Sequence, residues 1–204
     1  MNKLDLKQAL KHLYRASAKA PAVVDVPPMN YLMIDGSGDP NTAQMYRDAV
    51  SALYSVAYTL KFSLKKREGV DYPVMALEGL WWVEDLSTLD RADKSNWLWT
   101  MMIVQPDFVT QAVFEAAVEE VRKKKNPPLL DQIRFESYHE GLSAQILHLG
   151  PYAAETPTID RLYAYMDANG YVHNGRHHEI YLNDPGRTAP EKLKTIIRQP
   201  IAPK

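Results

Sequence analysis

The segment 177–182 reads His-His-Glu-Ile-Tyr-Leu and contains the acidic residue whose setting is most suggestive of chemistry. Its alternation of polar and apolar residues predicts a β-strand, in which neighbouring side chains point to opposite faces. His177, Glu179 and Tyr181 would then share one face. A carboxylate there could attract a cationic ligand or, with a raised pKa, act as a general acid or base. A solvent-facing glutamate at the rim of a sheet is the alternative.

All four tryptophans fall between positions 81 and 99, in two segments that are expected to be strands, 75–84 and 96–105. Trp81 lies on the first strand, and its neighbour in the sequence must point to the opposite face. On the second strand, one face carries Trp97, Trp99 and Met101. Such a row of rings predicts a flat wall for a planar ligand. Ordinary core packing is the alternative, because buried tryptophan is common.

The sequence offers no set of residues that is typical of a metal or cofactor site. It has no cysteine, which excludes disulfides, thiolate ligands and a cysteine nucleophile. His177 and His178 would point to opposite faces of their strand, so they are poorly placed to share a metal ion. The Gly-Ser-Gly turn at 36–38 lacks the spacing of a phosphate-binding loop. We therefore expect no metal and no cofactor.

Charge and hydropathy narrow the choice of partners. The 24 Lys and Arg residues against 25 Asp and Glu leave a formal net charge of −1, so no basic field exists to hold a nucleic acid. The N-terminal segment is polar and amphipathic, and no apolar stretch reaches the length of a membrane span. We expect a cytoplasmic protein whose partner is a small hydrophobic or cationic ligand, with no nucleic-acid or membrane partner. The oligomeric state is left open.

Apolar periodicity and turn residues divide the chain into helices and strands. A proline-containing tether is expected at 20–28, and residues 132–149 are expected to form a hairpin. Asn41 or Thr42, and later Thr158, could cap helices. The expected helices are 3–16, 42–66, 107–125 and 158–169, and the expected strands are 30–35, 75–84, 96–105, 132–138, 143–149, 177–183 and 195–200.

The order strand, glycine-containing turn, capped helix, strand, strand occurs twice along the chain. The first copy covers about 29–105 and the second about 132–200. This order predicts an α+β fold in which two β-α-β-β repeats pair around an approximate two-fold axis with a ligand cleft between them. Residues 1–20 would form a short N-terminal helical arm and residues 21–204 the ligand-binding domain.

Three stretches resemble a known family: NYLMIDGSGDPN, YPVMALEGLWW and HHEIYLNDPGRTAPEKLKTIIRQPI. The chain is similar to GyrI-like small-molecule-binding proteins over about residues 20–201, and most of all to bacterial members without a DNA-binding domain. The resemblance implies a pair of SH2-like β-α-β-β repeats around a pseudo-two-fold axis. It also implies an aromatic pocket for lipophilic cations whose central acidic residue corresponds to Glu179. The Trp-Trp pair of the family corresponds to Trp81 and Trp82.

Two functions follow as expectations. The first is a protein that binds planar, hydrophobic and often cationic molecules between aromatic walls, with Glu179, His177 and Tyr181 on the polar side. The second is a detoxifying hydrolase, because some members of the family are reported to open cyclopropanoid DNA-alkylating compounds. In that reaction Glu179 would activate water and a tyrosine would donate a hydrogen bond to the developing phenolate. The candidate tyrosines are Tyr72, Tyr138 and Tyr181, which the sequence does not distinguish.

Overall fold

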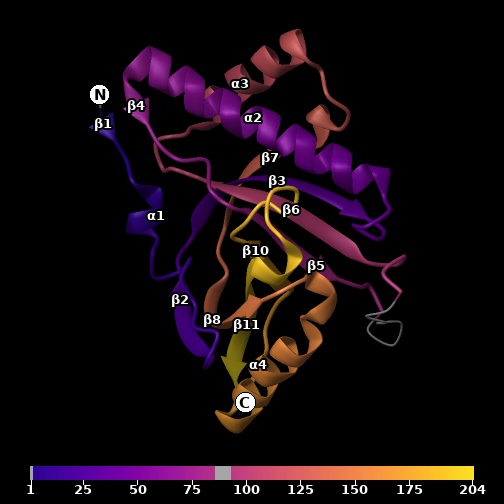
Figure 1. The fold of residues 1–204 in the computed structure, drawn as a ribbon. Helices are drawn as coiled ribbons and strands as arrows, with labels where there is room; N and C mark the ends of the chain where they lie inside the picture. Colours follow the sequence, from indigo (N-terminus) through magenta and orange to yellow (C-terminus); the bar gives the residue numbers. More distant parts are fainter. Residues whose placement is uncertain (1, 86–92) are drawn as a thin grey trace. The chain divides into compact units, whose positions relative to one another are not determined.

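The computed structural model describes residues 2–85 and 93–204 and has a mixed α+β fold in which most strand pairs are antiparallel (Figure 1). This confirms the expected fold class, and the described residues include four α-helices, of which the first is a short N-terminal one. By their internal contacts the residues divide into two compact units. Unit 1 consists of residues 1–9, 29–75 and 81–138, and unit 2 consists of residues 10–28, 76–80 and 139–204.

Unit 1 is built on three antiparallel strands in the order β6, β3 and β7. Two helices, α2 and α3, pack against each other, and α2 also contacts β3 and β6 (Figure 1). The helix α2 buries one apolar face, as its periodicity predicts. The elements of unit 1 are α1 (Leu6–Ala9), α2 (Gln44–Glu68), α3 (Gln111–Lys124), η2 (Leu130–Gln132), β1 (Asn2–Lys3), β3 (Met29–Ser37), β4 (Val70–Asp71), β6 (Leu98–Gln105) and β7 (Arg134–Tyr138).

A glycine on β3 makes room for a tryptophan on β6. Gly36 lies opposite Trp99 in the register of the two strands. A Cβ atom at position 36 would lie 2.0 Å from the Cη2 atom of Trp99, which is far closer than van der Waals contact permits. The indole ring is fully buried. The pair therefore fits only because one residue has no side chain.

Unit 2 has the strand order β2, β8, β11, β10 and then the first part of β5, with β9 pairing on β11. Its helix α4 packs on β8 and β9. The elements are β2 (Ala22–Val26), β5 (Leu77–Trp82), β8 (Gly141–Leu149), η3 (Tyr152–Ala154), α4 (Thr156–Ala168), β9 (Tyr171–His173), β10 (His177–Tyr181), η4 (Pro190–Lys192) and β11 (Lys194–Pro203). The expected repeat of element order is confirmed along the chain, as β3-α2-β5-β6 and β8-α4-β10-β11.

The two faces of the unit 2 sheet differ in chemistry. The face under α4 holds a hydrophobic core formed by Ala144, Ile146, Leu162, Met166, Ile197 and Ile201. Because side chains alternate along a strand, the neighbours Gln145 and Arg198 point to the other face. Both are buried, as is His178. This second face is therefore polar, although it is closed to solvent.

The N-terminal helix is much shorter than expected, since it ends at Ala9 instead of continuing to residue 16. Beyond it, the carbonyl oxygen of Leu13 accepts a hydrogen bond from Arg198, and that of Arg15 accepts one from Gln145. The carbonyl groups of Leu13 and Arg15 are thus hydrogen-bonded by side chains of the unit 2 sheet, and not by backbone N–H groups of a longer helix.

The predicted hairpin over 132–149 is wrong. β7 pairs with β3 in unit 1, whereas β8 pairs with β2 and β11 in unit 2. The connection 139–140 passes from one unit to the other instead of reversing the chain, and Gly141, the first residue of β8, has a φ of 73°. Glu140 in this connection is buried and forms ion pairs with His178 and Arg198 of unit 2. Local sequence patterns do not reveal such contacts.

The expected tether and helix caps also need correction. The segment 22–26 is a strand, β2, which pairs with β8, and the prolines lie outside it. Ala43 occupies the N-cap position of α2 and gives no side-chain cap. The hydroxyl of Thr158 does not cap α4, because it is paired with Nδ1 of His148 at 2.9 Å. No helix in the described part of the chain is long and apolar enough to cross a membrane.

Candidate functional site

Glu179 lies at the centre of a polar cluster on β10. Its Oε1 is 3.2 Å from Nε2 of His177, and its Oε2 accepts a hydrogen bond from the Tyr181 hydroxyl at 2.8 Å. The three side chains share one face of the strand, as the alternation of the sequence predicts. The carboxylate side chain is only 12% exposed. It is therefore a mostly buried carboxyl group with a phenol and an imidazole in contact.

A second aromatic ring belongs to this cluster. Tyr152, in the short helix η3, lies edge-on to Tyr181 with 5.5 Å between the ring centroids. Tyr152 could not be recognised as a site residue from the sequence, because nothing in the local pattern relates η3 to β10. The Glu179 carboxylate, two tyrosine rings and His177 together form what we call the β10 cluster. A carboxylate beside aromatic rings is a chemistry that suits an organic cation.

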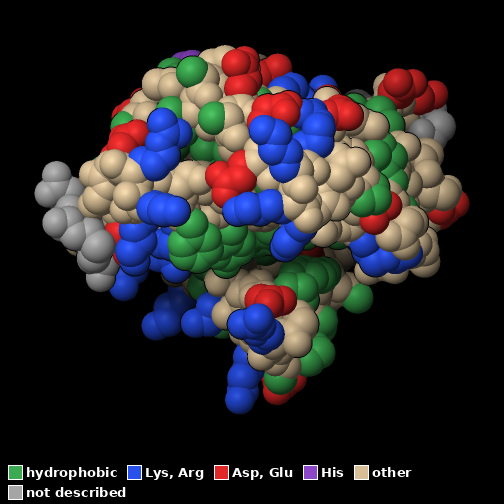
Figure 2. Space-filling view, turned by 90° about the horizontal axis from the view of Figure 1, so that it is seen from above, with side chains coloured by type: hydrophobic (Ala, Val, Ile, Leu, Met, Phe, Trp, Pro, Cys, Tyr) green, Lys and Arg blue, Asp and Glu red, His purple; other side chains and the backbone are tan. Residues whose placement is uncertain are grey.

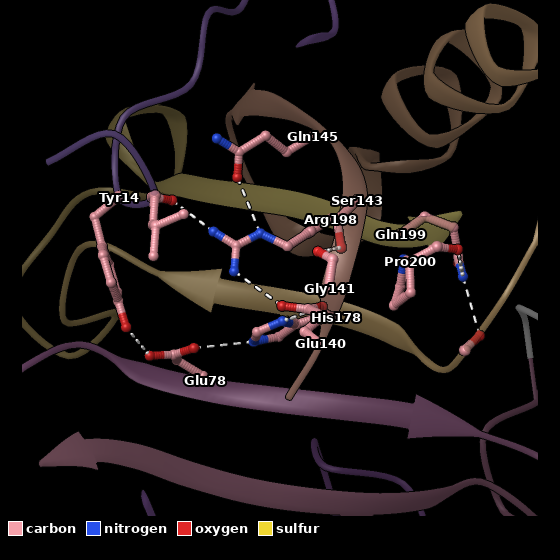
Figure 3. Close-up of polar contacts among 12 residues, drawn as sticks. Tyr14, Glu78, Glu140, Gly141, Ser143, Gln145, His178, Arg198, Gln199 and Pro200 are labelled. Carbon is pink, nitrogen blue, oxygen red and sulfur yellow. Dashed lines mark hydrogen bonds and ion pairs between the residues drawn. The ribbon is translucent and has the colours of Figure 1, made fainter. Parts of the chain in front are cut away.

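The opposite face of β10 carries a buried histidine between two carboxylates (Figure 3). His178 is fully buried, with its Nδ1 2.8 Å from Oε1 of Glu140 and its Nε2 3.0 Å from Oε2 of Glu78. Both ring nitrogens of His178 thus face a carboxylate, which favours the doubly protonated, cationic form of the ring. Burial alone would lower the pKa of His178, but the two carboxylates outweigh it and raise the pKa to about 9.

The charges continue from Glu140 to Arg198 on β11. The Nη1 of Arg198 lies 3.0 Å from Oε2 of Glu140, and its Nε donates to Oε1 of Gln145 at 3.0 Å. Burial opposes ionisation of Glu140, but the neighbouring His178 and Arg198 cations lower its pKa to about 2. At the other end, the Tyr14 hydroxyl donates to Glu78. Two anions thus alternate with two cations, and Figure 3 shows them as one continuous chain.

The sequence gives almost no sign of this charge network. Glu78, Glu140, His178 and Arg198 come from three strands and one connection, and only their tertiary contacts bring them together. The one available signal was the parity of β10, which places His178 on the face opposite Glu179. The network lies on the face of β10 that is opposite to Glu179. On this same face, Arg198 and its neighbour Gln145 donate hydrogen bonds to the backbone carbonyls of Leu13 and Arg15.

The tryptophans predicted to form a wall lie together in unit 1. Tyr46 of α2 stacks on Trp81 with 6.2 Å between the ring centroids, and meets Trp99 edge-on at 5.5 Å. Trp97 lies 5.9 Å from Trp81, and the ammonium group of Lys94 sits 4.8 Å from the Trp97 ring centre. Trp97 is partly exposed, unlike the other two tryptophans. It is the most exposed of these three rings.

The remaining predicted residues have mainly packing contacts. Met101 is fully buried on β6. Tyr138 lies edge-on to Tyr31, with 6.3 Å between the ring centroids, and Tyr72 lies edge-on to Phe108 at 5.6 Å. The Tyr72 hydroxyl is buried without a hydrogen-bond partner among the described residues, and burial raises its pKa.

Among the three candidate tyrosines, Tyr181 donates a hydrogen bond to Glu179. Tyr72 and Tyr138 belong to unit 1. No group of three or more acidic or histidine side chains in residues 2–85 and 93–204 is arranged to hold a metal ion.

The fold and the site define a mixed α+β protein with a half-buried carboxylate among aromatic rings. The sequence profile of the GyrI-like small molecule binding domain matches residues 19–202, and the chain belongs to that family. No curated protein matches the chain.

Similar solved structures come from Listeria innocua. An uncharacterized conserved protein is 40% identical, with 98% of this chain and 100% of that chain covered and a TM-score of 0.91. A hydrolase encoded by lin2189 is 38% identical, with the same coverage and a TM-score of 0.88. A third structure, also described as a hydrolase, is 36% identical, again with 98% and 100% coverage, and has a TM-score of 0.85.

Proposed function

We propose that this protein binds hydrophobic, planar and often cationic small molecules, and that Glu179 attracts their positive charge. The observation that supports this most is the half-buried carboxylate of Glu179 between His177 and Tyr181, with the Tyr152 ring close by. Membership of a small-molecule-binding family makes an organic ligand the natural occupant.

General magnitudes indicate how much of the binding free energy comes from burial of ligand rings and how much comes from ligand charge. Burial of apolar ring surface contributes about 25 cal/mol per Å², so a planar molecule of modest size gains most of its affinity from area. A partly buried carboxylate adds cation–π and ion-pair attraction only when the ligand carries a positive charge. Glu179 therefore determines which sign of ligand charge is preferred more than it determines the total affinity.

The test compares a cationic and a neutral ligand on wild type and Glu179→Gln. Rhodamine 6G is a suitable cation and Nile red a suitable uncharged dye, with fluorescence anisotropy as the measurement. We expect Glu179→Gln to weaken binding of the cation by about 10-fold or more and to change binding of the neutral dye by less than about 3-fold. Glu191→Gln, which removes an exposed carboxylate in the same unit, is the control and should leave both affinities unchanged. Equal loss for both dyes would contradict the selective role.

Trp97 provides a separate test of the proposed aromatic contribution. It is partly exposed, whereas Trp81, Trp99 and Met101 are buried. If ligand rings lie on Trp97, Trp97→Ala should weaken both dyes by about 10-fold, because a stacked aromatic contact contributes about 1 kcal/mol beyond its buried area. An unchanged affinity would remove Trp97 from the list of ligand-contacting residues.

A second candidate is hydrolysis of cyclopropanoid DNA-alkylating compounds. It is supported by the two similar Listeria innocua structures that are described as hydrolases. In the proposed step, water forms a bond to a cyclopropane carbon, and the carbon–carbon bond to the conjugated ring breaks. Its electron pair converts the dienone into a phenolate. Glu179 takes the proton from water and the phenolate receives one, so one water is consumed without any redox change.

Tyr181 is the favoured tyrosine for this reaction, since its hydroxyl already reaches Glu179. The test follows a spirocyclopropane dienone by its absorbance and by the mass of one added water. We expect Glu179→Gln to abolish turnover while Nile red still binds, and Tyr181→Phe to lower the rate by about 10-fold or more. Loss of cationic-dye binding in Glu179→Gln, with no turnover by the wild type at any enzyme concentration, would reject the hydrolase and leave the binding function intact.

A further inference from the structure

The outer side of α2 presents a row of stacked aromatic rings. Tyr54, Tyr58 and Phe62 are spaced four residues apart, so they lie along one side of the helix. The ring centroids are 6.1 Å apart in both neighbouring pairs, with interplanar angles of 29° and 20°. Tyr58 is 47% exposed and Phe62 is 57% exposed. We call these three residues the aromatic band.

The aromatic band is separate from the core contacts of α2. The helix turns Leu53, Leu60 and Leu64 inward, and all three are buried. In the space-filling view, which looks down on the side of the protein that carries α2, hydrophobic side chains form a continuous patch bordered by Lys and Arg (Figure 2). Exposed tyrosine and phenylalanine in one patch are enriched at the centres of protein interfaces. The band thus has the composition of a contact surface.

We infer that α2 pairs in antiparallel orientation with α2 of a second copy of this chain, about a two-fold axis level with residues 57 and 58. The interface around such an axis is isologous, so the aromatic band of each copy contacts the aromatic band of the other. Tyr58 meets its own counterpart, and Tyr54 of each copy lies near Phe62 of the other. The helix dipoles oppose each other in this orientation, which favours it electrostatically.

The charges at the ends of α2 are complementary in this register. Asp48 and Lys66 lie ten and eight positions to either side of Tyr58, on the same side of the helix, so each Asp48 lies close to Lys66 of the other copy. Arg47 and Glu68 lie eleven and ten positions to either side and pair in the same way. In a parallel arrangement the basic last turn would meet itself, and like charges would repel. The charge pattern therefore selects the antiparallel dimer.

The cations beside the band favour a protein partner over an anionic lipid surface. Lys61 and Lys65 both bind the carboxylate of Asp71, each at 2.8 Å. Hydrogen bonds from these two lysines lower the pKa of Asp71 to about 2, so the carboxylate stays ionised. Much of the positive charge next to the rings is thus balanced within the chain. A lipid headgroup would find less attraction there than the lysine count suggests.

The experiment measures the mass of the full chain in solution by sedimentation equilibrium over a range of concentrations. We expect the wild type to form a dimer, and the double variant Tyr58→Ser, Phe62→Ser to raise the dimer dissociation constant by about 30-fold or more. Phe108→Ser is the matched control, because it removes another exposed ring, 37% exposed, that is not on α2. It should leave the dissociation constant within about 3-fold. Far-UV circular dichroism of each variant checks that the helices are retained.

A charge exchange tests the register. Lys66→Glu places a carboxylate against Asp48 of the other copy and should weaken the dimer about 5-fold to 10-fold, as should Asp48→Lys. The two substitutions together restore the opposite-charge pair and should recover the wild-type dissociation constant within about 3-fold. A monomeric wild type at all concentrations, or a dimer that the band variants do not weaken, would overturn the inference. So would a monomer that binds vesicles of phosphatidylglycerol and phosphatidylcholine through the aromatic band.

Discussion

His178 and Glu140 form an ion pair from which solvent is excluded: Nδ1 lies 2.8 Å from Oε1, and neither side chain is more than 1% exposed. Glu78 faces the other nitrogen of the ring, and Arg198 takes the other oxygen of Glu140. Desolvation of four ions is costly, and each is tolerated because its neighbours carry the opposite charge. The network is therefore sensitive to the loss of any single member.

Replacement of His178 by glutamine should strongly destabilise the protein. The variant retains a polar side chain but leaves Glu78 and Glu140 without the cation between them. We expect a loss of about 3–5 kcal/mol in the free energy of unfolding, measured by chemical denaturation. Ile180→Val, on the same buried face of β10, is the control and should cost about 1 kcal/mol. A His178→Gln loss no greater than that of the control would show that the network contributes little.

The free energy of unfolding should fall as the pH rises from about 6.5 to about 9. The pKa of His178 is about 9 in the folded protein and near 6.5 when unfolded. Below pH 6.5 His178 is protonated in both the folded and the unfolded state, so the stabilisation is complete. It is lost as the pH rises through the folded-state pKa and His178 of the folded protein gives up its proton. The shift corresponds to a contribution on the order of 3 kcal/mol. Denaturation at a series of pH values should show this decline, and His178→Gln should lose it. A wild-type stability that does not decline in this range would contradict the prediction.

Gly36→Ala should destabilise unit 1 by direct collision with Trp99. The added Cβ would lie 2.0 Å from the ring, and overpacking of this kind costs about 1–3 kcal/mol or more. Combining it with Trp99→Leu, which removes the ring, should give a loss smaller than the sum of the two single losses, as measured by thermal denaturation. Gly186→Ala, at an exposed turn, is the control. Strict additivity of the two substitutions would show that the collision does not occur.

Tyr72→Phe should leave stability unchanged or raise it by about 1 kcal/mol. The hydroxyl of Tyr72 is buried without a partner in the described part of the chain, so its removal relieves a desolvation cost and breaks no hydrogen bond. Chemical denaturation measures the change. Tyr181→Phe is the contrasting variant, because it removes the hydrogen bond to Glu179. A clear loss of stability in Tyr72→Phe would point to a hydrogen bond made by that hydroxyl.

Local patterns in the sequence were sufficient to predict several features of the site and of the fold. The alternation at 177–181 predicted that Glu179 shares a face with His177 and Tyr181, and the hydrogen bonds agree. The same periodic reasoning located α2, α3 and α4, the order of elements in the two repeats, and the clustering of the tryptophans, but it made the N-terminal helix too long. These features depend on the geometry of one strand or one helix, which is encoded locally.

The charge network could not be predicted in this way. Glu140 lies in a connection that was expected to close a hairpin, and its partners His178 and Arg198 are 38 and 58 residues away. Tyr152 reaches Tyr181 from a separate short helix. Such contacts depend on which strands become neighbours and in which register, and neither is written in the pattern of any single segment.

The hydrogen bond from Arg198 to the carbonyl of Leu13 joins residues 185 positions apart. During synthesis the chain emerges from its N-terminus, so Leu13 is made long before its hydrogen-bond partner Arg198. The chain also passes between the two units at five points, which leaves neither unit as an uninterrupted stretch. Unit 2 therefore cannot be completed before Arg198 has left the ribosome, so the formation of this unit depends on contacts between residues far apart in the sequence.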